Sequence, residues 1–285
     1  MKEKMEVSSD YKSLLEAVMA LRGNCSSNRA RKLIKSGVIA VDGNTAKLPT
    51  IAIKKGQIIT IIDLSQQDNN KSAVYPVMFE DEMVCVFEKP VGVPALKSGS
   101  KIASASDNMI KYLRQKNGDE VYTVLNRVDK KESGLMIIGI GLKTSRSLRE
   151  EANLKYRHYA IVEGKLREEK GRWMHHLKVN SIGLFKGFEA GKGKEAIVDY
   201  QVMKTGGGFS LLKLSPVDYF KGQLRAQCAL RGCAIAGDKR YGAKTNPLAH
   251  PCLHLFSISF THPKSGERID VKTKVPTPFL SLLKK

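Results

Sequence analysis

Residues 125–139 (LNRVDKKESGLMIIG) place a carboxylate and a guanidinium two positions apart, directly before an apolar run. The apolar run predicts a buried strand, so Arg127 and Asp129 fall on the extended turn that leads into it. A nearby cation favours the ionised form of a carboxylate and a rigid strand fixes its direction, as a carboxylate nucleophile requires. The same residues also fit a surface turn with a local Arg–Asp ion pair, and the segment alone favours that simpler interpretation.

A second set of reactive side chains lies nearer the C-terminus. The spacing of its cysteines does not form the paired C-x-x-C arrangement of a typical zinc site, and residues 252–260 alternate as a strand does. Cysteine is also among the residue types most often buried. The sequence therefore predicts no metal site. The side chains concerned are Cys228, Cys233, His250, Cys252 and His254.

Basic side chains form a third group, on a predicted helix that follows Ser26 and Ser27 and ends before Gly37. Such a helix can bind the phosphates of a nucleic acid, because arginine offers planar donors and lysine a point charge. Most charged helix faces are simply solvated, so both interpretations stay open on these residues alone. The four side chains are Arg29, Arg31, Lys32 and Lys35.

The segments that must position these side chains are mostly strands, with helical stretches between them at residues 108–115, 143–152 and 223–230. Strands and helices do not alternate one for one. We therefore expect an α+β fold with a large mixed, mostly antiparallel sheet, rather than a doubly wound fold. The predicted strands of this sheet cover residues 83–87, 135–140, 158–162, 197–202, 210–214 and 253–260.

The sequence divides into four parts. Residues 1–10 are polar and are expected to form a flexible tail. Residues 11–64 contain two short helical patterns followed by short strands, which predicts a small α/β module. Residues 65–73 begin with SQQDNNKS, a run without apolar residues that predicts a linker. The remainder, residues 74–285, is the predicted large domain.

The charge balance indicates a polyanionic partner. The 285 residues include 48 Lys and Arg against 28 Asp and Glu, a formal net charge of +20, and nucleic acid is the commonest partner of such a chain. No stretch approaches the roughly 18 apolar residues of a bilayer-spanning helix, so we expect no membrane partner. Five cysteines without a pairing pattern indicate reduced thiols and hence a cytoplasmic protein.

Two resemblances to known families extend these interpretations. SSNRARKLIKSGVIAVDGNTAKLPTIAIKKGQIITI, within residues 11–64, resembles the αL RNA-binding module. LNRVDKKESGLMIIG resembles the H-R-L-D-x-x-T-S-G signature of the RluA-type pseudouridine synthases, and four further segments match that family in the same order. These segments are FEKPVGVPA (87–95), YRHYAIVEG (156–164), GQLRAQCALRGCAIAGDKRYG (222–242) and LHLFSISFTHPKSGE (253–267).

The second resemblance implies an isomerase that converts uridine to pseudouridine in RNA and needs no cofactor and no metal. It implies that Asp129 is the catalytic carboxylate, that Arg127 fills the space left by a flipped-out uridine, and that Arg225 pairs with Asp129. It further implies that His158, at the position of the family's stacking tyrosine, or the adjacent Tyr159 stacks on the uracil.

Departures from the family pattern leave a second hypothesis open: a decayed synthase scaffold that acts as an RNA-binding or ribosome-assembly protein. Retention of Arg127, Asp129 and Arg225 together favours the enzyme. We expect an RNA partner, ribosomal rather than transfer RNA because of the appended module, and a monomeric protein. No recognition-helix dimer supports DNA binding. The departures are Asn126 for the family His, Glu132 for Thr, His158 for Tyr, Gly222 for the His before Gln223, and Asp218, Tyr219 and Phe220 for T-G-R.

Overall fold

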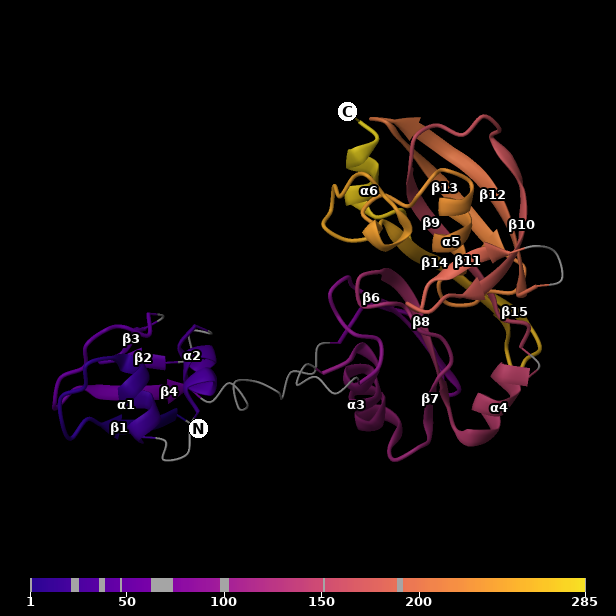
Figure 1. Ribbon diagram of the computed structural model, residues 1–285. Coiled ribbons are helices and arrows are strands. Elements are labelled where there is room, and N and C mark those ends of the chain that lie inside the picture. Colours follow the sequence, from indigo (N-terminus) through magenta and orange to yellow (C-terminus); the bar gives the residue numbers. More distant parts are fainter. Residues whose placement is uncertain are drawn as a thin grey trace. The chain divides into compact units, whose positions relative to one another are not determined.

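The computed structural model separates into two units, Met1–Lys71 and Ser72–Lys285, which are described one at a time (Figure 1). The predicted linker, residues 65–73, lies outside the described residues. No helix in the described part of the chain is long and apolar enough to cross a membrane. The structure describes residues 2–21, 26–35, 39–46, 48–62, 74–97, 103–150, 152–188 and 192–284.

The N-terminal unit packs two helices, α1 (Leu14–Leu21) and α2 (Ser27–Lys35), with a four-stranded antiparallel sheet of order β1-β4-β2-β3. Its core is formed by fully buried aliphatic side chains from both helices and from the sheet, among them Leu14, Ile34 and Ile59. The strands are β1 (Lys2–Glu6), β2 (Ile39–Val41), β3 (Asn44–Thr45) and β4 (Ile58–Ile62).

The expected flexible tail over residues 1–10 is wrong for residues 2–6. These residues form β1, which pairs antiparallel with β4 from Lys2 opposite Ile62 to Glu6 opposite Ile58. The polar composition of this segment misled the prediction. β4 is paired with β2 along one edge, and the backbone groups of its other edge accept β1 whatever side chains β1 carries.

The second unit is built on an eleven-stranded sheet, which confirms the predicted α+β fold. The strand order is β11-β10-β12-β13-β9-β14-β8-β6-β5, with β15 paired to β14 and β7 to β8. Neighbouring strands run antiparallel except β14 and β8, which are parallel. The strands are β5 (Val77–Glu80), β6 (Val84–Lys89), β7 (Tyr122–Val124), β8 (Ser133–Ile140), β9 (Lys155–Glu163), β10 (Lys170–Val179), β11 (Phe185–Phe188), β12 (Lys194–Gly206), β13 (Phe209–Pro216), β14 (Leu253–Thr261) and β15 (Arg268–Lys272).

Helices cover different parts of this sheet (Figure 1). Helix α3 buries Met109 and Leu113 in the cluster formed by β6 and β8, and its first turn is closed by a capping box between Ser104 and Asp107. Helix α5 contributes Leu224 and Cys228 to a second cluster, formed by β9, β12 and β13. The helices are α3 (Ala105–Asn117), α4 (Leu142–Glu150), α5 (Gln223–Leu230) and α6 (Thr277–Leu282), with a 3₁₀ turn at Lys239–Tyr241.

The two halves of the sheet join where β8 meets β14. Gly134 faces Leu255 across this parallel contact, and its φ of +130° is one that glycine tolerates. A Cβ atom on Gly134 would overlap the backbone of Leu255. The adjacent Ser133 hydroxyl lies 2.8 Å from Nδ1 of His254, which ties the same two strands together. The Ser-Gly pair of the 125–139 segment therefore serves close strand packing.

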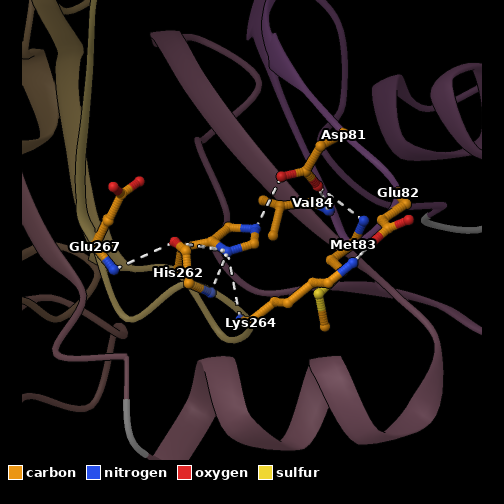
Figure 2. A network of polar contacts seen from close by, with 8 residues as sticks. Asp81, Glu82, Met83, Val84, His262, Lys264 and Glu267 are labelled. Carbon is orange, nitrogen blue, oxygen red and sulfur yellow. Dashed lines mark hydrogen bonds and ion pairs between the residues drawn. The ribbon is translucent and has the colours of Figure 1, made fainter.

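A polar network fastens two turns of the same half of the sheet (Figure 2). Asp81 accepts hydrogen bonds from the backbone amides of Met83 and Val84, and its other carboxylate oxygen lies 2.8 Å from Nε2 of His262. Nδ1 of His262 accepts from the amides of Lys264 and Ser265, at 3.3 and 3.2 Å. Asp81, His262 and Ser265 suggest a catalytic triad with a serine nucleophile. Nδ1 of His262, however, already accepts hydrogen bonds from two backbone amides. The network therefore stabilises the turns.

Candidate active site

The loop that carries Asp129 runs from β7 to β8 and is clamped to β8. The side chain of Asn126 donates to the Leu135 carbonyl at 3.0 Å and accepts from the Ile137 amide at 2.9 Å. It thus makes the backbone hydrogen bonds that a neighbouring strand would make with β8. Asp129 follows three residues later, and its side chain is 26% exposed. The carboxylate is therefore held by a rigid loop and is still accessible to a substrate. Asn126, which replaces the family histidine, supports this loop rather than weakening it.

Two cations from a distant segment approach Asp129. Nζ of Lys221 contacts Oδ1, and Nη1 of Arg225 lies 3.6 Å from Oδ2. Lys221 belongs to the loop after β13, and Arg225 to the first turn of α5. Arg127 is exposed, and no ion pair joins it to Asp129 among the residues that the structure describes. The positive charge beside the carboxylate thus comes from across the fold, and not from the neighbouring arginine in the sequence.

Arg225 is held chiefly by a buried aspartate. Its Nε and Nη2 atoms each donate to Asp238 at 2.6 Å, and the side chain of Asp238 is 1% exposed. The guanidinium also lies over the ring of Tyr241, 5.1 Å from its centre. Burial would lower the pKa of Arg225, but the hydrogen bonds and charge of Asp238 outweigh this effect and raise it. Arg225 therefore remains charged and is fixed in direction before it meets Asp129.

Two more ionisable side chains, those of Lys89 and Glu132, lie near Asp129. Lys89 is fully buried at the end of β6 and donates to the carbonyls of Pro90, Val93 and Glu132, at 2.7 to 3.0 Å. Burial lowers the pKa of Lys89 to about 8. The carboxylate of Glu132 is 9% exposed and lies 3.8 Å from Nη1 of Arg225. Lys89 therefore ties the segment after β6 to the Asp129 loop through backbone carbonyls.

Replacing Glu132 by glutamine is expected to raise the free energy of unfolding at pH 8 by about 1–3 kcal/mol, with little effect near pH 5. Burial, followed by the charge of Asp129, raises the pKa of Glu132 from 4.5 to about 7, against the opposing charges of Arg225 and Lys221. The folded state therefore keeps a proton that the unfolded state loses between these values. Stability falls as the pH rises through this window, and the folded protein carries a buried charge above it.

Denaturant unfolding at pH 5 and pH 8 measures this effect. Glu168→Gln, at an exposed position of the same unit, is the matched control and is expected to change stability equally at both pH values. A stabilisation by Glu132→Gln that does not grow between pH 5 and pH 8 would contradict the assignment of the buried charge.

Three aromatic rings lie next to the charged cluster, which consists of Asp129, Glu132, Lys221, Arg225 and Asp238. Tyr219, in the loop before α5, has its ring centre 4.7 Å from that of His158 and 5.7 Å from that of Tyr156. His158 is 2% exposed, and burial lowers its pKa to about 3. Tyr159 points to the opposite face of β9, as alternation in a strand requires, and stacks on Phe256 at 3.8 Å. The structure therefore brings His158 toward the site but covers it with Tyr219.

The predicted RNA-binding cations lie on α2 of the N-terminal unit. Ala30 and Ile34 of this helix are buried in the core of the unit, and Arg31 is exposed. The side chains of Arg29, Lys32 and Lys35 lie outside the described residues.

Comparison with known proteins decides the family. A model of the RNA pseudouridylate synthase family matches residues 83–230, which is more than half of the chain. The chain belongs to this family. The match includes the Asp129 loop, the whole of β9 and helix α5, so the predicted enzyme class, an RNA pseudouridine synthase, is confirmed.

The relatives of this RNA pseudouridylate synthase have low sequence identity to it, but they align with most of its length. A ribosomal large subunit pseudouridine synthase C of Rickettsia bellii is 28% identical over 211 residues, 71% of this chain and 69% of the relative. An uncharacterised RNA pseudouridine synthase of Aquifex aeolicus is 25% identical over 280 residues, 90% of this chain and 88% of the relative. Human RNA pseudouridylate synthase domain containing 1 has the same fold, with a TM-score of 0.59, 20% identity, and coverage of 74% of this chain and 87% of that one.

Sequence reasoning missed several residues of this synthase's charged cluster. Asp238 lies in the GDKRYG part of a motif quoted for the family, so the motif could have indicated it. Lys221 and Tyr219 gave no such signal. Tyr219 stands where the family pattern has a glycine, and Lys221 stands where the pattern accepts any residue. In the part of the chain that the structure describes, no three His, Cys, Asp or Glu residues are placed to hold a metal ion.

Proposed function

We propose that this synthase isomerises specific uridines of large-subunit ribosomal RNA, with Asp129 as the carboxylate that acts on the flipped-out nucleotide. The observation that carries the proposal is the position of Asp129. It is rigidly held, 26% exposed, and accompanied by Lys221 and Arg225. The names of relatives such as the Rickettsia bellii enzyme indicate ribosomal RNA as the substrate class.

The reaction matches what these side chains offer. The C1′–N1 bond of uridine breaks, the uracil turns, and a C1′–C5 bond forms, while N1 gains a proton and C5 loses one. No electrons enter or leave. The carboxylate either attacks C1′ and is displaced when C5 bonds to C1′, or removes the C2′ proton and returns it. The nucleotide must leave its stack, and in this proposal Arg127, which is exposed two residues before Asp129, fills the vacated space.

The test is the pseudouridine content of ribosomal RNA from a host lacking its own large-subunit synthases, with and without this chain. New pseudouridine in the expressing strain, mapped to the large-subunit RNA, is the expected result. Absence of new pseudouridine with tight RNA binding retained would favour the decayed-scaffold hypothesis instead. Repeating the reaction on RNA from the native source would show whether the host merely lacked the right substrate.

We also propose that the N-terminal unit is an αL RNA-binding module that anchors the RNA through α2. Replacing Arg29, Arg31 and Lys32 by alanine is expected to weaken RNA binding and to lower the slope of log affinity against log salt by about 2–3, because each lost phosphate contact contributes about 0.7–0.9. Filter binding at several salt concentrations measures both quantities.

The matched control replaces three other lysines of the same unit, Lys12, Lys54 and Lys55, which are exposed and carry the same total charge. The control is expected to leave the salt slope nearly unchanged. An equal fall in both variants would mean that the charge of the unit matters and α2 does not.

The proposal includes a cytoplasmic location and a monomeric enzyme. Four cysteines, Cys85, Cys228, Cys233 and Cys252, are free and buried, which suits a reducing compartment. Asp129, Lys221, Arg225 and Glu132 all come from one chain, so a second copy is not needed to assemble the cluster. Light scattering of the purified protein would test the monomer.

A further inference from the structure

Tyr219 lies in the loop between β13 and α5, two residues before the lysine that contacts Asp129. Burial raises the pKa of Tyr219, and the negative charges of Glu132 and Asp129 raise it further. The phenol therefore keeps its proton near neutral pH. As a whole residue Tyr219 is partly exposed, whereas His158 is 2% exposed. Tyr219 thus packs on the aromatic residues of β9, within the loop whose Lys221 contacts the predicted catalytic carboxylate.

The loop is anchored on both sides of this ring. Tyr219 packs on His158, while the next residue, Phe220, packs against Phe185 at 5.1 Å between ring centres. The buried side chain of Gln223 accepts from the Phe220 amide at 3.2 Å and donates to the Ile197 carbonyl of β12 at 3.4 Å. These contacts fix the path of the loop and hold the Tyr219 ring in place before any substrate binds.

We propose that Tyr219 supplies the aromatic face on which the uracil of the flipped-out uridine stacks, an inference that rests on the proposed function. A base that has left its stack needs another flat surface, which an aromatic side chain near the reacting carboxylate can provide. His158 is 2% exposed beneath Tyr219, and the ring of Tyr159 is occupied by Phe256 at 3.8 Å. Tyr219 is less buried than His158, and its ring is tilted against its aromatic neighbours, whereas that of Tyr159 is stacked on Phe256.

This assignment gives two departures from the family pattern a common explanation. In the family motifs that this sequence resembles, a tyrosine stands at the position of His158 and a glycine at that of Tyr219. The two positions are far apart in the sequence, yet their rings lie 4.7 Å apart. A smaller ring on β9 leaves room for a large one on the loop, and the large ring covers the smaller. The ring on the loop and the ring on the strand therefore belong to one aromatic layer.

A photochemical experiment tests the contact itself. The full-length protein is irradiated with large-subunit ribosomal RNA transcribed with 4-thiouridine, the RNA is digested, and the attached nucleoside is located by mass spectrometry. Attachment to Tyr219 is the expected result. Attachment to Tyr159, or to other residues without Tyr219, would overturn the proposal. This readout does not need turnover, so it decides about Tyr219 even if wild type forms no pseudouridine and the proposed function fails.

Variants test the consequence for the reaction. Tyr219→Leu is expected to slow pseudouridine formation under single-turnover conditions by about 10- to 100-fold, with RNA affinity within about twofold. Tyr219→Phe is expected to retain the wild-type rate within about threefold, because the ring is kept. The double variant His158→Tyr/Tyr219→Gly restores the family arrangement and is expected to recover at least about tenfold over Tyr219→Gly alone. A wild-type rate for Tyr219→Leu, or no recovery in a folded double variant, would overturn the assignment.

Discussion

Replacing Asp129 by asparagine is expected to lower pseudouridine formation by at least about 1000-fold, because the amide can neither attack C1′ nor accept the C2′ proton. Asparagine has nearly the same size, so the Asn126 clamp and the loop from β7 to β8 should be undisturbed. RNA affinity should stay within about threefold. Phosphate contacts supply most of the affinity, and loss of a negative charge beside Lys221 and Arg225 does not weaken them.

Single-turnover assays on the mapped substrate, together with filter binding of the same RNA, separate these two effects. Asp119→Asn, at an exposed position of the same unit, is the control and should keep both the rate and the affinity of wild type. Full activity in the Asp129→Asn protein would exclude Asp129 as the catalytic group. Parallel loss of rate and RNA affinity would instead show that the substitution disturbs the RNA-binding surface.

Replacing Arg225 by methionine is expected to lower the free energy of unfolding by about 3–5 kcal/mol and to slow the reaction as well. Methionine keeps the unbranched apolar part of the side chain but leaves the carboxylate of Asp238, which is 1% exposed, without its two hydrogen bonds. It also removes the guanidinium that lies 3.6 Å from Asp129. Urea unfolding gives the first quantity, and single-turnover rates give the second.

A double variant separates the two roles of Arg225. Arg225→Met/Asp238→Asn removes both members of the buried ion pair, so it should recover part of the lost stability without recovering the rate. Arg225→Lys keeps a positive charge but cannot donate to both oxygens of Asp238 from a planar group, so an intermediate stability is expected. Recovery of the full rate in the double variant would show that Arg225 acts only by holding the fold together.

Local patterns sufficed for much of the secondary structure. The apolar run at residues 135–140 predicted β8, Ser133–Ile140, and the helix predicted at residues 223–230 is α5, Gln223–Leu230. Both patterns lie in consecutive residues, so the local conformation that they favour depends little on the rest of the fold. Strand β10 escaped prediction because Lys170–Val179 carries polar residues on both faces. Its pairing with β12 and β11 supplies the hydrogen bonds that its own pattern does not reveal.

The sequence by itself determined the enzyme family and pointed to the loop that carries Asp129, because ordered motifs survive as local strings of residues. The spacing of residues could not decide which cation faces that carboxylate, although the family resemblance implied Arg225. Arg127 is two residues away and exposed, whereas Lys221 and Arg225 come from the loop after β13 and from α5, remote in the sequence. Their approach depends on how β13 and α5 pack in the folded unit, and no spacing in the sequence encodes that distance.

The aromatic residues show the same division most clearly. The sequence placed His158 and Tyr159 side by side and offered both as stacking residues, but adjacent residues of a strand face opposite sides of a sheet. Tertiary packing decided that Tyr159 lies on Phe256 and that His158 lies beneath Tyr219. Which ring a substrate can reach is a matter of what covers each one, and covering residues come from strands and loops remote in the chain.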